Sequence, residues 1–280
     1  MTITAEHLGR AVDELGLAGR PVLVHAALRS FGEPLDGGAD ALTDALVDRG
    51  CTVLVPAFTE PHFGVAPPPS PPMRPARNGI DYSRPWPREP LAAPDVYTPG
   101  CGLVNPHLGA FPAALVARPG VHRGGHPLNS FAAVGPDAAA LVRDQSPVDV
   151  YAPLRALAER DGRSLLIGVG LNRMTVLHLA EQQSGRRLFR RWARTGDGRT
   201  ALVEVGSCSE GFPRLEPLLR ARARTTTVGA ARWLAHPVRE VLAAVAPVLA
   251  AEPGLTRCSA ECLACAHAAS GGPVETVPLG

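Results

Sequence analysis

The stretch SLLIGVGLNRMTVLHLAE, which runs from Ser164 to Glu181, decides the expected fold. Its apolar first part predicts a buried strand over residues 164–171, and its second part has the spacing of a helix over residues 172–184. The strand therefore delivers the chain directly into a helix. Because α/β proteins place chemistry where strand ends meet helix N-termini, this junction is also the first place to look for a functional site.

Three polar side chains recur every third residue along the expected helix: Thr175, His178 and Glu181. This spacing places a hydroxyl, an imidazole and a carboxylate on one side of the helix. A histidine that a carboxylate holds in one tautomer is suited to act as a general base. The alternative interpretation is a hydrogen-bonded pair at the edge of a core, which the spacing alone does not exclude.

The rest of the chain also alternates between helix and strand patterns. Before the junction, the patterns predict a helix over 5–16, a strand over 21–28, a helix over 38–48 and a strand over 51–58. Because a helix connects the two strands, we expect them to pair in parallel. The other expected elements are strands at 130–134 and at 200–205, a polar hairpin-like section around Asp197, and helices near 106–117, 137–144, 152–160, 213–222 and 229–250. We therefore expect the α/β class, with a mixed central sheet, helices on both faces and a small helical C-terminal portion.

One domain over residues 1–280 accounts for this order, with two unusual segments. Eleven prolines fall between residues 61 and 94, and neither a helix nor a central strand tolerates such a density. This proline-rich loop is either a floppy insertion or a functional loop, and its aromatic residues Phe63, Tyr82 and Trp86 favour a substrate wall or lid. The second unusual segment, residues 206–270, contains four of the six cysteines.

These four cysteines have a spacing that suits a metal. Cys258, Cys262 and Cys265 form a C-x3-C-x2-C pattern, and Cys208 lies well upstream. Four thiolates can close a tetrahedral structural Zn²⁺ site. The alternative is that the cysteines are small buried apolar side chains.

Composition restricts the class of protein further. A hydrophobic content of 45% and a charged content of 19% are typical of a soluble globular protein. The net charge of +2 is too small to argue for nucleic acid or a membrane surface as a partner. No stretch approaches the roughly 20 apolar residues that span a bilayer, and the N-terminus has no secretory pattern. We expect a cytoplasmic protein, whose cysteines are thiols or metal ligands, and leave a homodimer open.

Two further segments bring polar groups to strand ends. Residues 24–32, with Arg29 and Ser30, form a small-residue loop whose free N–H groups could hold a phosphate or a pantetheine arm. Arg123, His126 and Ser130 surround a Gly-Gly turn, and arginine is the usual bidentate partner of phosphate. An ordinary strand end and a surface turn would explain the same two patterns without a ligand.

Taken together, an ordered series of segments resembles the aminoglycoside 3-N-acetyltransferase family of CoA-dependent N-acyltransferases. The series covers most of residues 20–185 and consists of residues 24–32, 52–59, 95–99, 118–123, 125–135, 165–169 and 175–181. The resemblance implies an acyltransferase domain with the family's own α/β fold, which is distinct from the GNAT fold.

The resemblance also implies roles for particular residues. His178, supported by Glu181, would deprotonate an acceptor amine that attacks the thioester of acetyl-CoA, with Thr175 beside the oxyanion or the histidine. The co-substrate would be held by Ala27, Leu28, Arg29, Ser30, Phe31, Gly32, Arg123, His126, Ser130 and Phe131. The acceptor would contact Glu60, Asp95 and Tyr97.

The identity of the acceptor stays open. Aminoglycosides are polycations and require acidic pockets, but the expected acceptor loop carries equal numbers of both charges: Arg74, Arg77, Arg84 and Arg88 against Glu60, Asp81, Glu89 and Asp95. An amine on a neutral or anionic metabolite is therefore a second candidate acceptor. The same fold could also serve a non-catalytic metabolite-binding protein, or an acyltransferase that uses a different acyl donor in secondary-metabolite biosynthesis.

Overall fold

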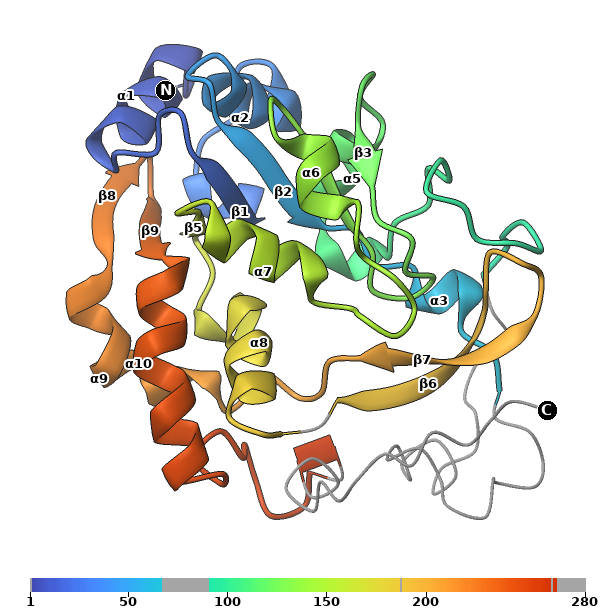
Figure 1. Cartoon of the computed structure of the whole chain (residues 1–280). Helices are drawn as coiled ribbons and strands as arrows, with labels where there is room; N and C mark the ends of the chain where they lie inside the picture. The colour runs from blue at the N-terminus through green and yellow to red at the C-terminus, as the bar shows by residue number, and fades with distance from the viewer. Residues whose placement is uncertain (1, 67–90, 187, 263, 266–280) are drawn as a thin grey trace.

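The computed structural model describes residues 2–66, 91–186, 188–262, 264 and 265. Seven of the described strands form one sheet in the order β3-β4-β2-β1-β5-β9-β8, and two more form a separate hairpin (Figure 1). The sheet strands are β1 (Pro21–Ala26), β2 (Thr52–Pro56), β3 (His122–Arg123), β4 (Phe131–Val134), β5 (Arg163–Ile167), β8 (Arg224–Val228) and β9 (Ala231–Pro237). The hairpin strands are β6 (Phe189–Arg194) and β7 (Thr200–Val205).

The centre of the sheet is parallel and its flanks are antiparallel. Strand β1 pairs in parallel with both β2 and β5, whereas β4 runs antiparallel to β2, and β9 runs antiparallel to β5. The expected parallel pair and mixed sheet are thereby confirmed. Strands covered on both faces read as continuous apolar runs, which explains the apolar character of residues 21–24 and 164–167.

Alternate residues of the central strands point into two separate hydrophobic cores. Val24 and Leu165 face one core, and Leu23 and Leu166 face the other, as the period of two in a strand requires. The first core is closed by α1 (Ala5–Glu14), α2 (Gly38–Val47) and α5 (Ala110–Val116). The second is closed by α6 (Ala138–Val142), α7 (Ala152–Glu159), α8 (Val176–Gln183) and α10 (Val238–Ala251), which cover the face seen in Figure 1. The predicted helices on both faces are thus confirmed.

Short helical turns connect these elements. The single-turn α-helices are α3 (Glu60–Phe63) and α9 (Glu216–Leu219). The 3₁₀ turns are η1 (Leu28–Phe31), η2 (Pro106–Leu108), η3 (Leu171–Arg173), η4 (Phe212–Leu215) and η5 (Arg220–Arg222). The predicted helix over 213–222 is therefore divided into three short turns, because Pro213 and Pro217 each remove a backbone donor.

The helix predicted over 229–250 is wrong in its first part. Residues 231–237 form β9, which pairs with β8 across a turn at Gly229, and α10 begins only at Val238. Gly229 has a φ of 57°, a left-handed conformation that glycine adopts easily. The β-branched run from Thr225 to Thr227 favours a strand just before it. The apolar residues after the turn suit a strand as well as a helix, so periodicity could not decide between them.

The strand predicted over 164–171 ends earlier, at Ile167. Gly168 has a φ of 63°, and a Cβ at this position would lie 1.8 Å from the Oγ atom of Ser30. The turn at Gly168 therefore needs a residue without a side chain, and it diverts the chain through η3 before α8 begins at Val176.

The β6–β7 hairpin extends from the end of α8 towards α3 (Figure 1). It forms where the polar section around Asp197 predicts a turn, and it packs on a third cluster that contains Phe63, Tyr97 and Phe189. The middle of the proline-rich loop, with Tyr82, Trp86, Arg74, Arg77, Asp81, Arg84, Arg88 and Glu89, lies outside the described residues. Within the described ranges, no helix combines the length and the apolar character that crossing a membrane requires.

Candidate active site

A cavity of about 430 Å³ lies at the C-terminal ends of the parallel strands β1 and β5. His25 comes from β1, whereas Thr175 and His178 come from the segment that follows β5. The opposite wall is formed by the β6–β7 hairpin and by residues 206–209 after it. The carboxyl ends of strands in an open α/β sheet are the usual place for a ligand, so the predicted strand-to-helix junction does border a cavity.

His178 and Glu181 form the predicted pair on α8. The Nδ1 atom of His178 lies 2.9 Å from Oε2 of Glu181, and the two side chains are 11% and 3% exposed. A carboxylate can only accept, so Nδ1 carries the hydrogen and the lone pair of the neutral ring lies on Nε2. Among the described residues, no hydrogen bond engages Nε2, which is therefore available to a molecule in the cavity.

The carboxylate of Glu181 is held on its other oxygen as well. The guanidinium of Arg186 donates to Oε1, and the hydroxyl of Thr256 donates to the same atom at 2.8 Å. Thr256 is only 1% exposed. With one oxygen used by the imidazole and the other by two donors, Glu181 fixes both the tautomer and the orientation of His178.

Aromatic rings enclose the imidazole of His178. The ring of Tyr151 lies parallel to it, with centroids 6.3 Å apart, and Phe212 meets it edge-on at 4.7 Å. A Cβ on Gly206 would lie 2.7 Å from the Tyr151 hydroxyl and 3.6 Å from Nε2 of His178. Only glycine therefore permits this close approach of the loop after β7.

The hydroxyl of Tyr151 is buried and has no hydrogen-bond partner in the described parts of the chain. Burial, with the charge of Glu181 as a second cause, raises the pKa of Tyr151 well above its usual value. The phenol therefore keeps its proton at neutral pH and is a donor beside the imidazole.

The sequence suggests that Thr175 lies beside His178, but in the structure Thr175 contacts His25. Its Oγ1 atom lies 2.8 Å from Nε2 of His25, a residue 150 positions earlier, and both residues line the cavity. Burial and the nearby Arg173 lower the pKa of His25 to about 3, so this imidazole is neutral at physiological pH. Sequence reasoning assigned His25 no role, and its position near the end of a central parallel strand is the signal that could have found it.

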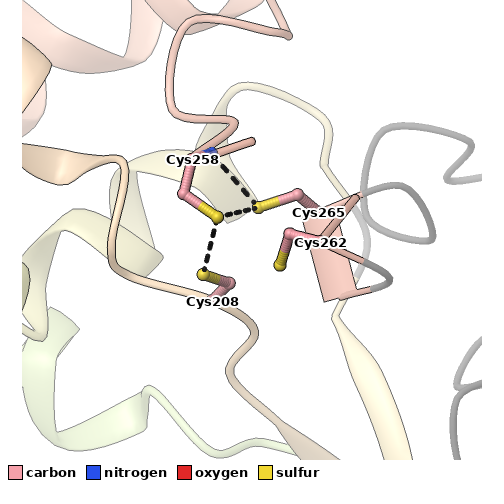
Figure 2. A group of neighbouring side chains, drawn as sticks. All are labelled: Cys208, Cys258, Cys262 and Cys265. Carbon is pink, nitrogen blue, oxygen red and sulfur yellow. Dashed lines mark hydrogen bonds between the residues drawn. The ribbon is translucent and has the colours of Figure 1, made fainter. Parts of the chain in front are cut away.

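The four predicted cysteines converge in space. Cys208 comes from the loop after β7, and Cys258, Cys262 and Cys265 come from the C-terminal segment (Figure 2). Their sulfur atoms all lie within 4.8 Å of one another, with 3.6 Å between Cys208 and Cys258 and 3.5 Å between Cys258 and Cys265. A tetrahedron with Zn–S bonds of about 2.3 Å separates its sulfurs by about 3.8 Å, so the spacing fits Zn²⁺.

The thiols of this cluster differ in acidity. The backbone N–H of Cys265 points at Cys262 and lowers the pKa of that thiol to about 7. Burial raises the pKa of Cys265 to about 11 and raises that of Cys208 as well. A cluster of thiols at such short range is costly as thiolates unless a cation neutralises it, which is what a bound metal does.

The sequence model of the aminoglycoside 3-N-acetyltransferase family matches residues 23–250, which is most of the chain. The chain belongs to the aminoglycoside 3-N-acetyltransferase family. The match begins in β1 and ends in α10. It includes Cys208, whereas the other three cysteines of the cluster lie beyond it.

Two curated relatives align with part of this chain. Aminoglycoside N(3)-acetyltransferase IX of Micromonospora chalcea is 33% identical over 187 residues, which are 64% of this chain and 62% of that protein. Aminoglycoside N(3)-acetyltransferase VII of Streptomyces paromomycinus is 32% identical over 187 residues, 64% of this chain and 60% of that protein. The chain thus spans little more than three fifths of the length of these relatives.

Solved structures resemble this family member over nearly its whole length. The apoenzyme of aminoglycoside acetyltransferase AAC(3)-IVa aligns with a TM-score of 0.76 at 25% identity, covering 97% of this chain and 99% of that one. AAC-IIIb, solved as a binary complex with CoASH, aligns with a TM-score of 0.72 at 24% identity, covering 89% and 97%. The fold of the aminoglycoside 3-N-acetyltransferases is thereby established for the chain.

The turn that the family resemblance assigns to CoA has its arginine engaged within the protein. Arg123 is 7% exposed, and its Nε atom donates to Oγ of Ser130 at 3.0 Å. Its two terminal nitrogens donate to the carbonyls of Cys101 at 2.5 Å, Leu103 at 2.8 Å and Ala57. The structure does bring Arg123 and Ser130 together, but neither side chain lines the cavity.

His126 lies in the same turn but has hydrogen-bond partners of its own. Its Nδ1 atom accepts from the backbone amides of Leu128 and Asn129, and its Nε2 atom donates to the carbonyl of Glu204 at 2.6 Å. Burial lowers the pKa of His126 to about 4, so the ring is neutral. Phe131 is fully buried in β4. These residues fasten loops to the sheet, and their contact with CoA stays a prediction.

The predicted loop from Ala27 to Gly32 winds into η1 at the end of β1. Phe31 is fully buried against Trp233, with ring centroids 6.2 Å apart, and Ser30 lies beneath Gly168. Arg29 is exposed. None of these residues lines the cavity, so the loop borders the site from outside and its role towards CoA also stays a prediction.

Of the three residues predicted to contact the acceptor, Glu60 alone lines the cavity, where it pairs with Arg191. Asp95 has a fully exposed side chain near Arg194, with 3.7 Å between the charged atoms. The structure therefore separates Asp95 from the cavity.

Tyr97 is 2% exposed, and its hydroxyl donates to the backbone carbonyl of Gly124 at 2.7 Å. Its ring meets Phe63 edge-on at 5.3 Å, and burial raises the pKa of Tyr97 to about 12. The side chain thus belongs to the core beneath the hairpin. Any contact of Tyr97 or Asp95 with an acceptor stays a prediction.

Proposed function

We propose that this family member is an acetyl-CoA-dependent N-acetyltransferase in which His178 is the general base. The observation that carries the proposal is the arrangement of the imidazole. Glu181 holds Nδ1, whereas Nε2 has no hydrogen-bond partner in the described part of the chain and the residue lines the cavity. A neutral imidazole held in one tautomer can accept the proton that an amine loses when it attacks a thioester.

In the proposed step, the acceptor amine attacks the carbonyl carbon of the acetyl thioester. A C–N bond forms, and the nitrogen gives one proton to Nε2 of His178. The C–S bond then breaks, the sulfur leaves with the bonding electrons, and the imidazolium returns the proton to it. The products are an N-acetyl amide and CoA, and no covalent enzyme intermediate is needed when both substrates are bound together.

Two hydroxyls near the imidazole could stabilise the oxyanion of this step. Thr175 is fixed by His25, and Tyr151 carries a buried hydroxyl with no partner among the described residues. If His25 donates to Thr175 through Nε2, the Thr175 hydrogen is free to point at the oxyanion. A donor that is already oriented before the reaction lowers the barrier more than one that must reorganise.

The cavity suits acetyl-CoA in its chemistry. Exposed Arg173 stands at the cavity, where a guanidinium can pair with the phosphates of CoA. The loop at residues 27–32 lies at the end of β1, next to the same cavity wall. The solved relative AAC-IIIb is described as a complex with CoASH, which supports the same co-substrate here.

For the acceptor, we infer an amine of an aminoglycoside or of a related small molecule. The names of the curated relatives support an aminoglycoside. The described cavity wall favours a less cationic amine, because it carries Arg173, Arg191 and one carboxylate, Glu60, which Arg191 already neutralises. An amine on a neutral or anionic metabolite is therefore the second candidate.

Thiol release from acetyl-CoA tests this proposal. The purified chain is incubated with acetyl-CoA and a panel that contains aminoglycosides, a neutral amine and an amine that carries a carboxylate or phosphate. We expect turnover with at least one amine, and mass spectrometry of the product to show one added acetyl group. Absence of turnover across the panel, together with no binding of CoA by calorimetry, would contradict the proposal and favour a non-catalytic binding protein.

We also propose that the four converging thiolates hold one structural Zn²⁺ ion. The support is the S–S spacing of Cys208, Cys258, Cys262 and Cys265, which fits a tetrahedral site. Metal analysis of the purified protein should give one equivalent of zinc. Less than about half an equivalent, with all four thiols freely titratable, contradicts the site, because structural zinc is bound tightly and as thiolate. Free thiols and acetyl-CoA both fit a cytoplasmic location, which stays a prediction.

A further inference from the structure

We propose that the cysteine site fastens the C-terminal segment, residues 253–262 with Ala264 and Cys265, across α8, and that Thr256 thereby positions Glu181 and His178. This inference rests on the proposed acetyltransferase function and on the proposed zinc ion. It adds a positioning residue and gives the metal a role in the reaction site, although the metal touches no reacting atom.

The first observation is that the C-terminal segment supplies or anchors both donors that hold Oε1 of Glu181. Thr256 donates to this oxygen directly at 2.8 Å. Arg186 donates to the same oxygen and also to the backbone carbonyl of Pro253 at 2.6 Å. If this segment moved away, Glu181 would lose one donor and the anchor of the other.

The second observation is that the segment packs directly on the loop that lines the cavity. A Cβ on Gly211 would lie 1.9 Å from the carbonyl oxygen of Thr256, so the two backbones touch at this glycine. Arg214 donates to the carbonyls of Leu255, Arg257 and Cys258. The segment from 252 to 262 has no helix or strand of its own, so these contacts and the cysteines have to hold it in place.

The third observation is the origin of the four sulfurs. Cys208 belongs to the cavity wall after β7, whereas Cys258 lies two residues after Thr256 (Figure 2). Ala264, between Cys262 and Cys265, lines the cavity with His178. A metal bound by all four cysteines would therefore join the cavity wall after β7 to the segment whose Thr256 holds Glu181.

A metal crosslink suits this position better than a disulfide does. The sulfur atoms of Cys208 and Cys258 are 3.6 Å apart, whereas a disulfide requires about 2.05 Å. A disulfide would also engage two of four sulfurs and leave the others as thiols. A single tetrahedral ion uses all four and closes the long loop between residues 208 and 258.

The test compares five forms of the full chain: wild type, Cys262→Ser, Thr256→Val, Thr256→Ser and Cys51→Ser. The last is a control for loss of a thiol, because a serine hydroxyl can still donate to the carbonyl of Leu17 as the Cys51 thiol does. For each form, zinc content, kcat, the KM for acetyl-CoA and hydrogen exchange of the amides at 254–258 are measured.

We expect Cys262→Ser to lose zinc, to exchange faster at 254–258 and to lower kcat about tenfold, the size expected when one hydrogen bond to a charged group is lost. Thr256→Val should keep its zinc and lower kcat to a similar extent, with a smaller change in KM. Thr256→Ser should retain both zinc and kcat, since its hydroxyl can still reach Glu181. Cys51→Ser should match the wild type.

A zinc-free Cys262→Ser with unchanged exchange rates and unchanged kcat would overturn the inference, as would a Thr256→Val variant as fast as Thr256→Ser. A wild-type protein that transfers no acetyl group refutes the proposed function instead. In that case zinc content and hydrogen exchange still decide whether the metal fastens the segment. A disulfide or a metal other than zinc at the four sulfurs contradicts the proposed ion.

Discussion

This protein contains two buried polar clusters that are each built around one charged side chain, Arg123 in one and Glu181 in the other. The two clusters differ in what their atoms contact. The Arg123 cluster places a guanidinium against Ser130 and three backbone carbonyls, and it does not line the cavity. The Glu181 cluster places a carboxylate between His178, Arg186 and Thr256. Each cluster satisfies its buried charge completely, as a buried charge requires.

The two clusters differ in whether a polar atom is left without a hydrogen-bond partner among the described residues. In the Arg123 cluster, the hydrogen bonds end on the protein's own backbone, so the cluster fastens loops together. In the Glu181 cluster, the chain of contacts ends on His178, which lines the cavity and whose Nε2 atom has no partner among the described residues. A buried polar network therefore signals chemistry when one of its atoms is left for a ligand, and signals structure when none is.

The largest expected effect is that of His178→Ala. Removing a general base typically lowers the rate by about 10²- to 10⁴-fold, so kcat for acetyl transfer should fall within that range. The melting temperature should also fall, because the change leaves Oε2 of the buried Glu181 without its donor, although Oε1 keeps Arg186 and Thr256. Steady-state thiol release and thermal unfolding check the two statements. A variant that turns over like the wild type refutes the assignment of the base.

The matching substitution in the Arg123 cluster is Arg123→Met, which should lower the free energy of unfolding. The change leaves the carbonyls of Cys101 and Leu103 without the guanidinium donor, at a cost of about 1–3 kcal/mol for each group left unsatisfied, whereas the Ala57 carbonyl keeps the Ser130 hydroxyl as a donor. We expect the free energy of unfolding in urea to fall by about 3 kcal/mol or more. Unchanged stability with a large rise in the KM for acetyl-CoA would show instead that Arg123 binds CoA directly.

The pH dependence of stability should report on His126, which lies in the same turn as Arg123 and Ser130. His126 is fully buried, and burial lowers its pKa from the usual 6.5 to about 4. Between these values the unfolded chain binds a proton that the folded chain does not, so the free energy of unfolding falls as the pH is lowered from 7 to 5. The expected loss is about 2 kcal/mol for this histidine. Burial lowers the pKa of His25 to about 3 and that of His236 to about 4, so urea unfolding at the two pH values measures the summed loss of the three histidines, and greater stability at pH 5 would contradict the neutral buried rings.

The smallest expected effect is on the glycine that faces His178. Gly206→Ala brings a methyl group to 2.7 Å from the Tyr151 hydroxyl and 3.6 Å from Nε2 of His178. We expect kcat to fall by about tenfold, which corresponds to about 1.4 kcal/mol in the barrier. Gly102→Ala is the matched control, because a Cβ there meets nothing within 4 Å and should leave kcat unchanged. Equal rates for the two variants would contradict the tight approach at Gly206.

The same contrast explains how far the sequence could be interpreted. Local spacing predicts the contact between His178 and Glu181, because residues three apart on a helix are neighbours. It cannot predict that Thr175 contacts His25, since those residues meet only when β1 and β5 pair. It also cannot predict the acceptors of Arg123, because backbone carbonyls leave no pattern in the sequence.

The fold shows a similar division. The central strands are predictable because burial on both faces makes them continuously apolar. The β8–β9 hairpin is not, since the apolar residues from Ala231 onward suit either a strand or a helix, and the turn at Gly229 decides between them. The cysteine cluster was predictable as a composition of ligands, but only the fold shows that Cys208 reaches the others.

The central claim is that Glu181 acts through His178, and a double-mutant cycle tests it most directly. Single-turnover rates of acetyl transfer are measured for wild type, His178→Ala, Glu181→Gln and the double variant. The account predicts that the double variant is no slower than His178→Ala, because Glu181 has no imidazole left to orient. Rate losses that multiply in the double variant would contradict the account, since the two residues would then act independently.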